Sequence, residues 1–175
     1  MKVGIVEKAD IGGVCLNWGC IPTKALRKSA QVFDYINHAE NYGITVKDAS
    51  ADFDAVVKRS RDVANGMSKG VQFLMKKNKI EVHNGFGKLV GKGKVEVDSD
   101  GKKTTLEAKN IILATGARER ELPHLKIDKK KVIGYHEALA LPKLPKSMVI
   151  VGSGAIGSEF AYFYNAMGTE VTLVE

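Results

Sequence analysis

Residues 148–157 read Met148-Val149-Ile150-Val151-Gly152-Ser153-Gly154-Ala155-Ile156-Gly157. A short apolar, β-branched run therefore leads into a loop of the form G-x-G-x-x-G, and a helical pattern follows to about residue 167. A second apolar strand pattern follows and ends at Glu175. A strand, a glycine loop, a helix and a second strand in this order predict the first βαβ unit of a dinucleotide-binding α/β fold.

The glycine spacing has a physical reason at each position. Gly152 allows the tight turn, Gly154 leaves room for a pyrophosphate near backbone amides, and Gly157 lets helix and strand pack closely. The Glu175 carboxylate can accept hydrogen bonds from ribose hydroxyls and repels a 2′-phosphate, which favours NAD over NADP. The plainer alternative is a glycine-rich turn without a ligand. The residues expected to line this nucleotide site are Gly152, Ser153, Gly154, Ala155, Ile156, Gly157 and Glu175.

The two cysteines of the chain lie close together in Gly12-Gly13-Val14-Cys15-Leu16-Asn17-Trp18-Gly19-Cys20-Ile21-Pro22-Thr23-Lys24. Their position suggests redox chemistry or metal binding. A zinc site needs about four ligands, and the four histidines are scattered along the chain without ligand spacing. We therefore expect no metal and interpret Cys15 and Cys20 as a redox-active disulfide; a buried, unreactive pair is the alternative.

Geometry restricts how these cysteines can bridge. On a regular helix their Cα atoms would lie roughly 8.6 Å apart, whereas a disulfide needs about 4.4–6.8 Å. The segment therefore cannot be a straight helix, and Gly19 and Pro22 suit a distortion. A helix N-terminus and a nearby lysine would favour a thiolate. Lys24 is the local candidate, although an ordinary surface lysine is an equal alternative.

Composition is ordinary for a soluble globular protein and allows a buried core. The chain has 175 residues, 44% of them hydrophobic, and a net charge of +7. Its lysines are dispersed without an interleaved aromatic stripe, so we expect no nucleic-acid binding. No apolar run is long enough to span a membrane, and the first residues do not resemble a signal peptide. We expect a protein kept in a reducing compartment, where a structural disulfide is unusual.

The rest of the chain divides by its periodicity. The patterns predict a buried strand at 3–6, helices at 24–38 and 53–77, a β-meander of short strands between 80 and 107, and a strand at 110–114. Leu26, Ala30, Phe33 and Ile36 share a face of the first helix, and Asp52 is a plausible N-cap of the second. The second helix presents an apolar face at Val56, Val63, Met67, Val71 and Leu74. We expect one domain over 1–117, a linker over 118–146 and a second domain starting at 147.

The segment from Gly12 to Lys24 resembles the active-site signature of the flavin-dependent pyridine nucleotide–disulfide oxidoreductases. Within that family the sequence of this segment is most similar to that of the dihydrolipoamide dehydrogenase branch. Ala114-Thr115-Gly116-Ala117, the preceding meander and the second glycine loop extend the resemblance over the whole chain. It implies a partial FAD-binding Rossmann-like domain with a β-meander insertion, followed by the start of an NAD-binding domain.

The resemblance also implies roles for single residues. Cys15 would be the interchange thiol beside the substrate and Cys20 the charge-transfer thiol beside the flavin. Lys24 would lie by the flavin and pair with Glu159. Val14 departs from the threonine often found there, so a hydroxyl contact to the cofactor is lost and a backbone contact remains. The residues that would contact FAD are Glu7 at the ribose, Gly12, Gly13, Val14, Lys24, Gly87 at the adenine, Thr115 and Gly116.

The implied reaction is oxidation of dihydrolipoamide with NAD⁺ as acceptor. Its implied partners are a lipoyl domain of a 2-oxo acid dehydrogenase or glycine cleavage complex and a second copy of the chain, in a bacterial cytoplasm or mitochondrial matrix. The family's first glycine loop, C-terminal His-Glu base and dimer-interface domain have no counterpart here. We therefore expect an internal fragment that is inactive alone. The alternatives are a glutathione- or mercuric-reductase-like enzyme, or a non-catalytic dinucleotide-binding fragment.

Overall fold

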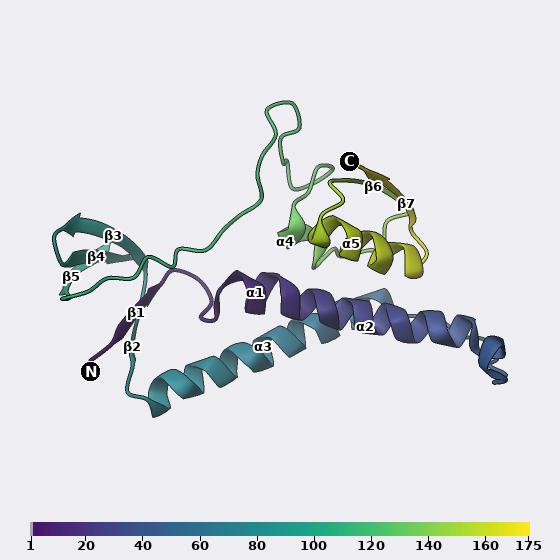
Figure 1. The fold of residues 1–175 in the computed structure, drawn as a ribbon, viewed down its shortest axis with the longest axis horizontal. Coiled ribbons are helices and arrows are strands. Elements are labelled where there is room, and N and C mark those ends of the chain that lie inside the picture. Colours follow the sequence, from purple (N-terminus) through teal and green to yellow (C-terminus); the bar gives the residue numbers. More distant parts are fainter. Residues whose placement is uncertain (1) are drawn as a thin grey trace. The chain divides into compact units, whose positions relative to one another are not determined.

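The computed structural model describes residues 2–175. They form two compact units, each assembled from two stretches of the chain (Figure 1). The first unit contains the residues up to Val14 together with Gly66–Ala117. The second contains Cys15–Asn65 and Arg118–Glu175. Helix α3, Phe53–Lys77, runs from the second unit into the first.

The first unit contains a two-stranded parallel sheet of β1, Gly4–Glu7, and β2, Glu81–Asn84. The strand expected near the N-terminus is thus present, but the expectation that it is buried is wrong, since its residues are half-buried or exposed. Residues 81–84 were expected in the meander and instead pair with β1. Local alternation predicted that strand correctly but could not identify its distant partner.

A three-stranded antiparallel meander completes the regular structure of this unit. It consists of β3, Phe86–Gly91, β4, Lys94–Ser99, and β5, Lys102–Glu107. The β4–β5 turn is tight because the Gly101 amide donates to the Asp98 carboxylate at 2.8 Å while Gly101 adopts φ 87°. The meander is confirmed for these three strands.

The strand expected at 110–114 is wrong. Residues 108–120 carry no regular secondary structure. Ile112 and Leu113 are 89% and 68% exposed, although the run is as apolar as the strands that do form. Strand conformation needs a neighbour that accepts and donates its backbone hydrogen bonds. Across residues 2–175, no other strand is paired with this segment.

The second unit holds the main hydrophobic core. Helix α2, Cys20–Asn37, and α5, Ala155–Ala166, lie side by side in Figure 1 and pack against each other. Leu26, Ala30, Phe160, Phe163 and Tyr164 are buried between them and their neighbours. The face predicted for α2 is confirmed at Leu26 and Ala30, whereas Ile36 lies near the helix end and is exposed.

A short helix contributes to the same core. Helix α4, Tyr135–Ala138, lies within the segment expected to link two domains. Ala138 and Leu139 are nevertheless buried, and the Tyr164 hydroxyl donates to the Ala138 carbonyl at 2.5 Å. Burial of that hydroxyl raises the pKa of Tyr164 far above its ordinary value. Tyr164 therefore remains a neutral donor whose hydrogen bond joins α5 to α4.

The 3-10 helix η1, Ala39–Tyr42, follows α2.

The predicted βαβ unit is confirmed. Strand β6, Ser147–Val151, leads through the glycine loop into α5, and β7, Glu170–Val174, returns parallel to β6. Ile150 lies opposite Leu173 in the register. The hydrogen bond from the Gly152 amide to the Val174 carbonyl, at 2.7 Å, extends the ladder to the start of the loop.

Helix α3 has the predicted length, but the apolar face predicted for it is not the face that it buries most deeply. Met67 and Leu74 are about half exposed, at 49% and 48%, while Ser60, Ala64 and Ser68 are buried. Small side chains allow close approach, and both serine hydroxyls donate to backbone carbonyls, Ser60 to Val57 and Ser68 to Ile11. The N-cap prediction is confirmed, since Asp52 Oδ1 accepts from the Ala55 amide at 3.0 Å.

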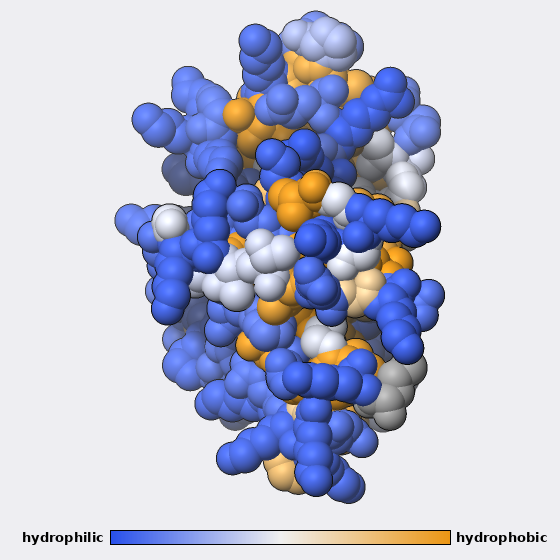
Figure 2. Space-filling model, turned by 90° about the vertical axis from the view of Figure 1, so that its left-hand side faces the viewer, coloured by the Kyte–Doolittle hydropathy of each residue, from blue (hydrophilic) through white to orange (hydrophobic). Residues whose placement is uncertain are grey.

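Polar groups cover most of the face shown in Figure 2, with smaller hydrophobic patches between them. Over residues 2–175, no helix is long and apolar enough to cross a membrane. The same part of the chain contains no cluster of three or more His, Cys, Asp or Glu side chains that could hold a metal ion.

Candidate functional site

A helix break brings the two cysteines together. Helix α1, Gly13–Trp18, ends just before Gly19, whose φ of −145° and ψ of −119° are not helical, and α2 begins at Cys20. The Gly19 carbonyl accepts the Thr23 amide at 3.1 Å and the Thr23 hydroxyl at 2.6 Å, which starts the new helix. The prediction that this segment is not a straight helix is confirmed, with the distortion at Gly19.

Cys15 and Cys20 are exposed free thiols in this structure. The expected disulfide therefore stays a prediction, and the Cys15 thiol acts on Cys20 as a hydrogen-bond partner. That hydrogen bond is the largest influence on the pKa of Cys20 and raises it; slight burial and the charge of Cys15 act in the same direction. The Lys24 ammonium and a backbone hydrogen bond at Cys20 lower the same pKa, so Lys24 is the side chain that favours a Cys20 thiolate.

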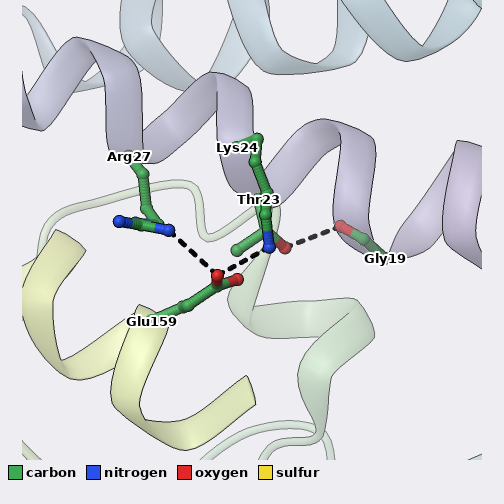
Figure 3. Close-up of polar contacts among 5 residues, drawn as sticks. All are labelled: Gly19, Thr23, Lys24, Arg27 and Glu159. Atoms are coloured by element: carbon green, nitrogen blue, oxygen red, sulfur yellow. Dashed lines mark hydrogen bonds and ion pairs between the residues drawn. The ribbon is translucent and has the colours of Figure 1, made fainter. Parts of the chain in front are cut away.

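An ion-pair cluster lies one helical turn after Cys20. The Lys24 ammonium donates to Glu159 Oε1 at 2.6 Å, and Arg27 Nη1 donates to the same oxygen at 3.0 Å (Figure 3). The hydrogen bond from Lys24 is the main reason that the pKa of Glu159 lies below its ordinary value. The Lys24–Glu159 contact implied by the resemblance is present, so a carboxylate from α5 holds the lysine beside Cys20.

Sequence reasoning missed Arg27. It lies three residues after Lys24 on α2, and residues so spaced share one helix face. Both cations therefore reach the same carboxylate of Glu159, whose side chain is 20% exposed. The i, i+3 spacing was the signal that could have identified Arg27. Two cations on one carboxylate leave this cluster with a net positive charge beside the thiols.

The glycine loop has the shape that a nucleotide pyrophosphate needs. Gly152 adopts φ 107°, a conformation that side-chain-bearing residues rarely take. A Cβ at Gly157 would overlap the Gly152 carbonyl oxygen, whereas a Cβ at Gly154 would meet nothing within 4 Å. The space over Gly154 is thus open at the N-terminus of α5, where backbone amides and the helix dipole favour an anion.

Glu175 lies across this loop. Its Oε2 accepts the Ser153 amide at 2.6 Å, and the hydrogen bonds with Ser153 lower the pKa of the carboxyl. Glu175 therefore carries its charge at the mouth of the loop. That charge fits hydroxyl-bearing ribose and opposes a 2′-phosphate. The Ser158 hydroxyl donates to the Ser153 carbonyl at 2.7 Å and steadies the same turn. Ala155 and Ile156 form the exposed start of α5.

The residues expected at FAD lie in the first unit, apart from Lys24. Glu7 Oε1 accepts the Ala9 amide at 2.9 Å, which leaves the other carboxylate oxygen for a further donor. A Cβ at Gly87 would lie 3.1 Å from Val6 Cγ1, so a side chain there would be crowded. The structure also brings Val14 beside Gly116, although a hundred residues separate them in sequence.

Three glycines of this group have backbone conformations that favour glycine. Gly12, Gly13 and Gly116 adopt φ values of 109°, 72° and 76°. Thr115 precedes the last of them and is exposed. Bare backbone at these positions fits close approach of a dinucleotide, and their contacts to FAD remain predictions.

The family model described as pyridine nucleotide-disulphide oxidoreductase matches residues 1–175. Dihydrolipoyl dehydrogenase from Zymomonas mobilis is 48% identical and that from Chlorobaculum parvum 52% identical, each over 100% of this chain. The chain spans 38% of the length of each of these curated relatives.

Solved structures agree on the fold. LpdA from Mycobacterium tuberculosis superposes with a TM-score of 0.89 at 24% identity, over 98% of this chain and 38% of that one. The HOCl-induced flavoprotein disulfide reductase RclA from Escherichia coli, in a Cu(II) complex, superposes with a TM-score of 0.84 at 28% identity. The match covers 99% of this chain and 36% of that one. Proteins of this family use FAD and a pyridine nucleotide, which is NAD in the dihydrolipoyl dehydrogenases. The chain belongs to the pyridine nucleotide-disulphide oxidoreductase family.

Proposed function

We propose that the protein carrying this chain oxidises dihydrolipoamide through Cys15 and Cys20, with NAD⁺ as the final acceptor. The observation that carries this proposal is the pair of free thiols on either side of the Gly19 break, with the Lys24–Glu159 ion pair beside it. The identity of 48–52% with dihydrolipoyl dehydrogenases supports that substrate over the other disulfide substrates of the family.

The thiol chemistry balances as a two-step exchange starting from the Cys15–Cys20 disulfide. One thiolate of dihydrolipoamide attacks the Cys15 sulfur, the Cys15–Cys20 bond breaks, and Cys20 leaves as a thiolate. The second substrate thiolate then attacks the substrate sulfur bound to Cys15 and closes the lipoamide disulfide, while Cys15 leaves. The pair has gained two electrons, and the two substrate protons go to the thiols or to solvent.

Lys24 has a positioning and electrostatic role in this scheme. Its ammonium lowers the pKa of Cys20, which makes Cys20 a better leaving group in the first step. Glu159 accepts a hydrogen bond from the ammonium at 2.6 Å and so orients the Lys24 side chain. Bound FAD would supply the two-electron chemistry between the reduced thiol pair and NAD⁺.

Each group of nucleotide-facing residues has one task in this proposal. Gly12, Gly13, Val14, Gly87, Thr115 and Gly116 offer backbone to FAD, and Glu7 accepts from its ribose. Gly152, Ser153, Gly154, Ala155, Ile156 and Gly157 offer backbone to the NAD pyrophosphate, and Glu175 accepts from the ribose. We assign residues 1–117 to the FAD-binding domain, 118–146 to a connection and 147–175 to the start of the NAD-binding domain.

The proposed partners follow from the substrate. Dihydrolipoamide reaches the thiols on a lipoyl domain of a 2-oxo acid dehydrogenase or glycine cleavage complex, and two copies of the whole protein form the active dimer. The relatives include bacterial dihydrolipoyl dehydrogenases, such as that of Zymomonas mobilis, and a mitochondrial dihydrolipoyl dehydrogenase of Dictyostelium discoideum. We propose the bacterial cytoplasm or the mitochondrial matrix as the compartment.

The test is NADH formation by the FAD-loaded whole protein with dihydrolipoamide and NAD⁺. Rapid turnover that requires dihydrolipoamide and disappears in Cys15→Ser supports the proposal. Turnover with glutathione disulfide and NADPH, but not with dihydrolipoamide, assigns the protein to another branch of the family. A flavin-loaded protein that shows no long-wavelength thiolate–flavin absorbance after dithiol addition, and no turnover, identifies a non-catalytic dinucleotide-binding protein.

A further inference from the structure

Trp18 lies between the two cysteines in sequence and is held by two side chains from distant elements. The Arg61 guanidinium, from α3, lies 3.7 Å from the centroid of the Trp18 ring. The His136 imidazole, from α4, stacks on Trp18 with centroids 3.6 Å apart and an interplanar angle of 25°. We call Trp18, Arg61 and His136 the Trp18 cluster. Its three members belong to the same compact unit as both cysteines.

The same arginine also holds the backbone at this point. Arg61 Nη1 donates to the Asn17 carbonyl at 2.6 Å. Asn17 is next to last in α1, where backbone carbonyls have no partner within the helix. Arg61 thus binds both the end of α1 and the ring of the residue that closes it. Charge-assisted hydrogen bonds are the stronger class, so this end of α1 is firmly anchored.

The cysteines themselves have no comparable anchor. Both are exposed, so packing around the sulfurs does little to hold them in place. Helix α1 has six residues, too few for a helix to be stable in water without tertiary contacts. A disulfide tolerates only a narrow range of Cα separations. The separation of the thiols therefore depends on what fixes the end of α1 and the break at Gly19.

We propose that Trp18 is a positioning residue for the redox pair: its contacts with Arg61 and His136 fix the turn that holds Cys20 within bonding range of Cys15. This inference rests on the proposed function only in taking these cysteines as the redox centre. It does not depend on the identity of the dithiol substrate. In this proposal Trp18 acts through the backbone between the cysteines.

The test is the thiol–disulfide equilibrium of the pair in the FAD-containing whole protein. Buffers of reduced and oxidised dithiothreitol set the potential, because each dithiothreitol that closes its ring disulfide reduces one Cys15–Cys20 disulfide to two thiols. Alkylation followed by mass spectrometry counts the free thiols. We expect Trp18→Leu to lower the equilibrium constant for Cys15–Cys20 disulfide formation roughly tenfold, because ring stacking and cation–π contacts are both lost.

Two variants supply the controls. Trp18→Phe keeps an aromatic ring and should stay within about threefold of the parent protein, a rescue that a loss of bulk alone would not give. Tyr35→Leu removes an aromatic contact with Tyr42 elsewhere in the same unit and should leave the equilibrium unchanged. If Trp18→Leu matches the parent within twofold, the proposal is wrong.

A second variant tests the proposal if Trp18→Leu does not fold. His136→Leu replaces an exposed side chain and removes its stacking contact with Trp18 and an edge contact with the neighbouring Tyr135, so the protein should remain folded. We expect it to lower the same equilibrium constant roughly threefold, and an unchanged value also overturns the proposal. A shift in the equilibrium without dihydrolipoamide turnover would reject the proposed substrate while supporting the role of Trp18. Dihydrolipoamide turnover by the parent protein, together with an equilibrium constant that Trp18→Leu leaves unchanged, would support the proposed substrate and reject the role of Trp18.

Discussion

The thiol segment, residues 13–24, and the glycine loop, residues 152–157, both lie where a helix begins, yet they are built in opposite ways. The thiol segment carries its chemistry on side chains, and Cys15, Cys20 and Lys24 are all exposed. The glycine loop offers bare backbone, and at Gly157 a single Cβ would overlap the Gly152 carbonyl. Substitutions of Cys15, Cys20 and Lys24 should therefore change reactivity while the fold survives, whereas those in the glycine loop should change binding or the fold itself.

The largest effect should come from Cys20→Ser. A serine oxygen cannot form the disulfide, so dihydrolipoamide-dependent NADH formation should fall by at least about 10³-fold. Cys20 is exposed, so the melting temperature should stay within about 2 °C of the parent. Steady-state kinetics and thermal denaturation measure the two quantities. A variant that kept full activity would contradict the assigned exchange.

Gly157→Ala and Gly154→Ala form a matched pair within the glycine loop. The Cβ at Gly157 has no room, so the free energy of unfolding should fall by about 2 kcal/mol. The Cβ at Gly154 meets nothing within 4 Å, so stability should hold while NAD affinity falls roughly tenfold, because the methyl group enters the space left for a pyrophosphate. Chemical denaturation and NAD titration separate the two effects. Equal stability losses would show that the loop is not open over Gly154.

Glu159→Gln tests the contact that connects the thiol segment with α5. The amide keeps its shape but loses the charge that pairs with Lys24 and Arg27, so stability at neutral pH should fall by about 1 kcal/mol. The pKa of Glu159 is lowered by folding. Its contribution is therefore complete above the ordinary value of 4.5 and is lost as the pH falls through the lowered pKa.

The difference in unfolding free energy between the parent and this variant, measured by urea denaturation, should thus disappear in acid. The thiols provide a second measurement. With Glu159 neutral, the Lys24 charge is no longer balanced, and the pKa of Cys20 should fall, as followed by the pH dependence of alkylation. A difference in stability that stayed constant as the pH fell through the lowered pKa of Glu159 would show that packing, and not charge, accounts for the role of Glu159.

The smallest effect should follow Glu175→Gln at the glycine loop. The amide still accepts a hydrogen bond but carries no charge, so NAD affinity should fall only about threefold while the preference for NAD over NADP narrows. Titrations with both nucleotides measure this change. An unaltered preference would mean that Glu175 does not face the ribose.

Short-range signals predicted the parts of this molecule whose partners lie nearby in sequence. The βαβ unit closes over a short stretch, and Gly152 and Gly157 are glycines for steric reasons that the motif itself expresses. The break at Gly19 followed from the geometry that two cysteines need. The contact between Lys24 and Glu159 came from the family resemblance, since nothing local connects residues so far apart.

Features that depend on distant neighbours were missed. The apolar pattern of residues 110–114 predicts a strand. A strand forms only beside another strand, and none of residues 2–175 pairs with this segment. Helix α3 buries Ala64 and two serines because small side chains allow close packing, which a count of apolar positions does not reveal. The contact of Trp18 with Arg61 and His136 joins three separate elements, so no local spacing encodes it.

The uncovered run at residues 110–114 has a consequence for how the chain behaves at high concentration. An apolar segment whose side chains are exposed, and with which no strand of residues 2–175 pairs, is a place where an intermolecular sheet can begin. Lys109 stands immediately before the run and Arg118 shortly after it. These positive charges at the two ends of the run repel the same charges on a second copy aligned in register, and this repulsion opposes aggregation. Aggregation should therefore increase with added salt, as screening weakens that repulsion.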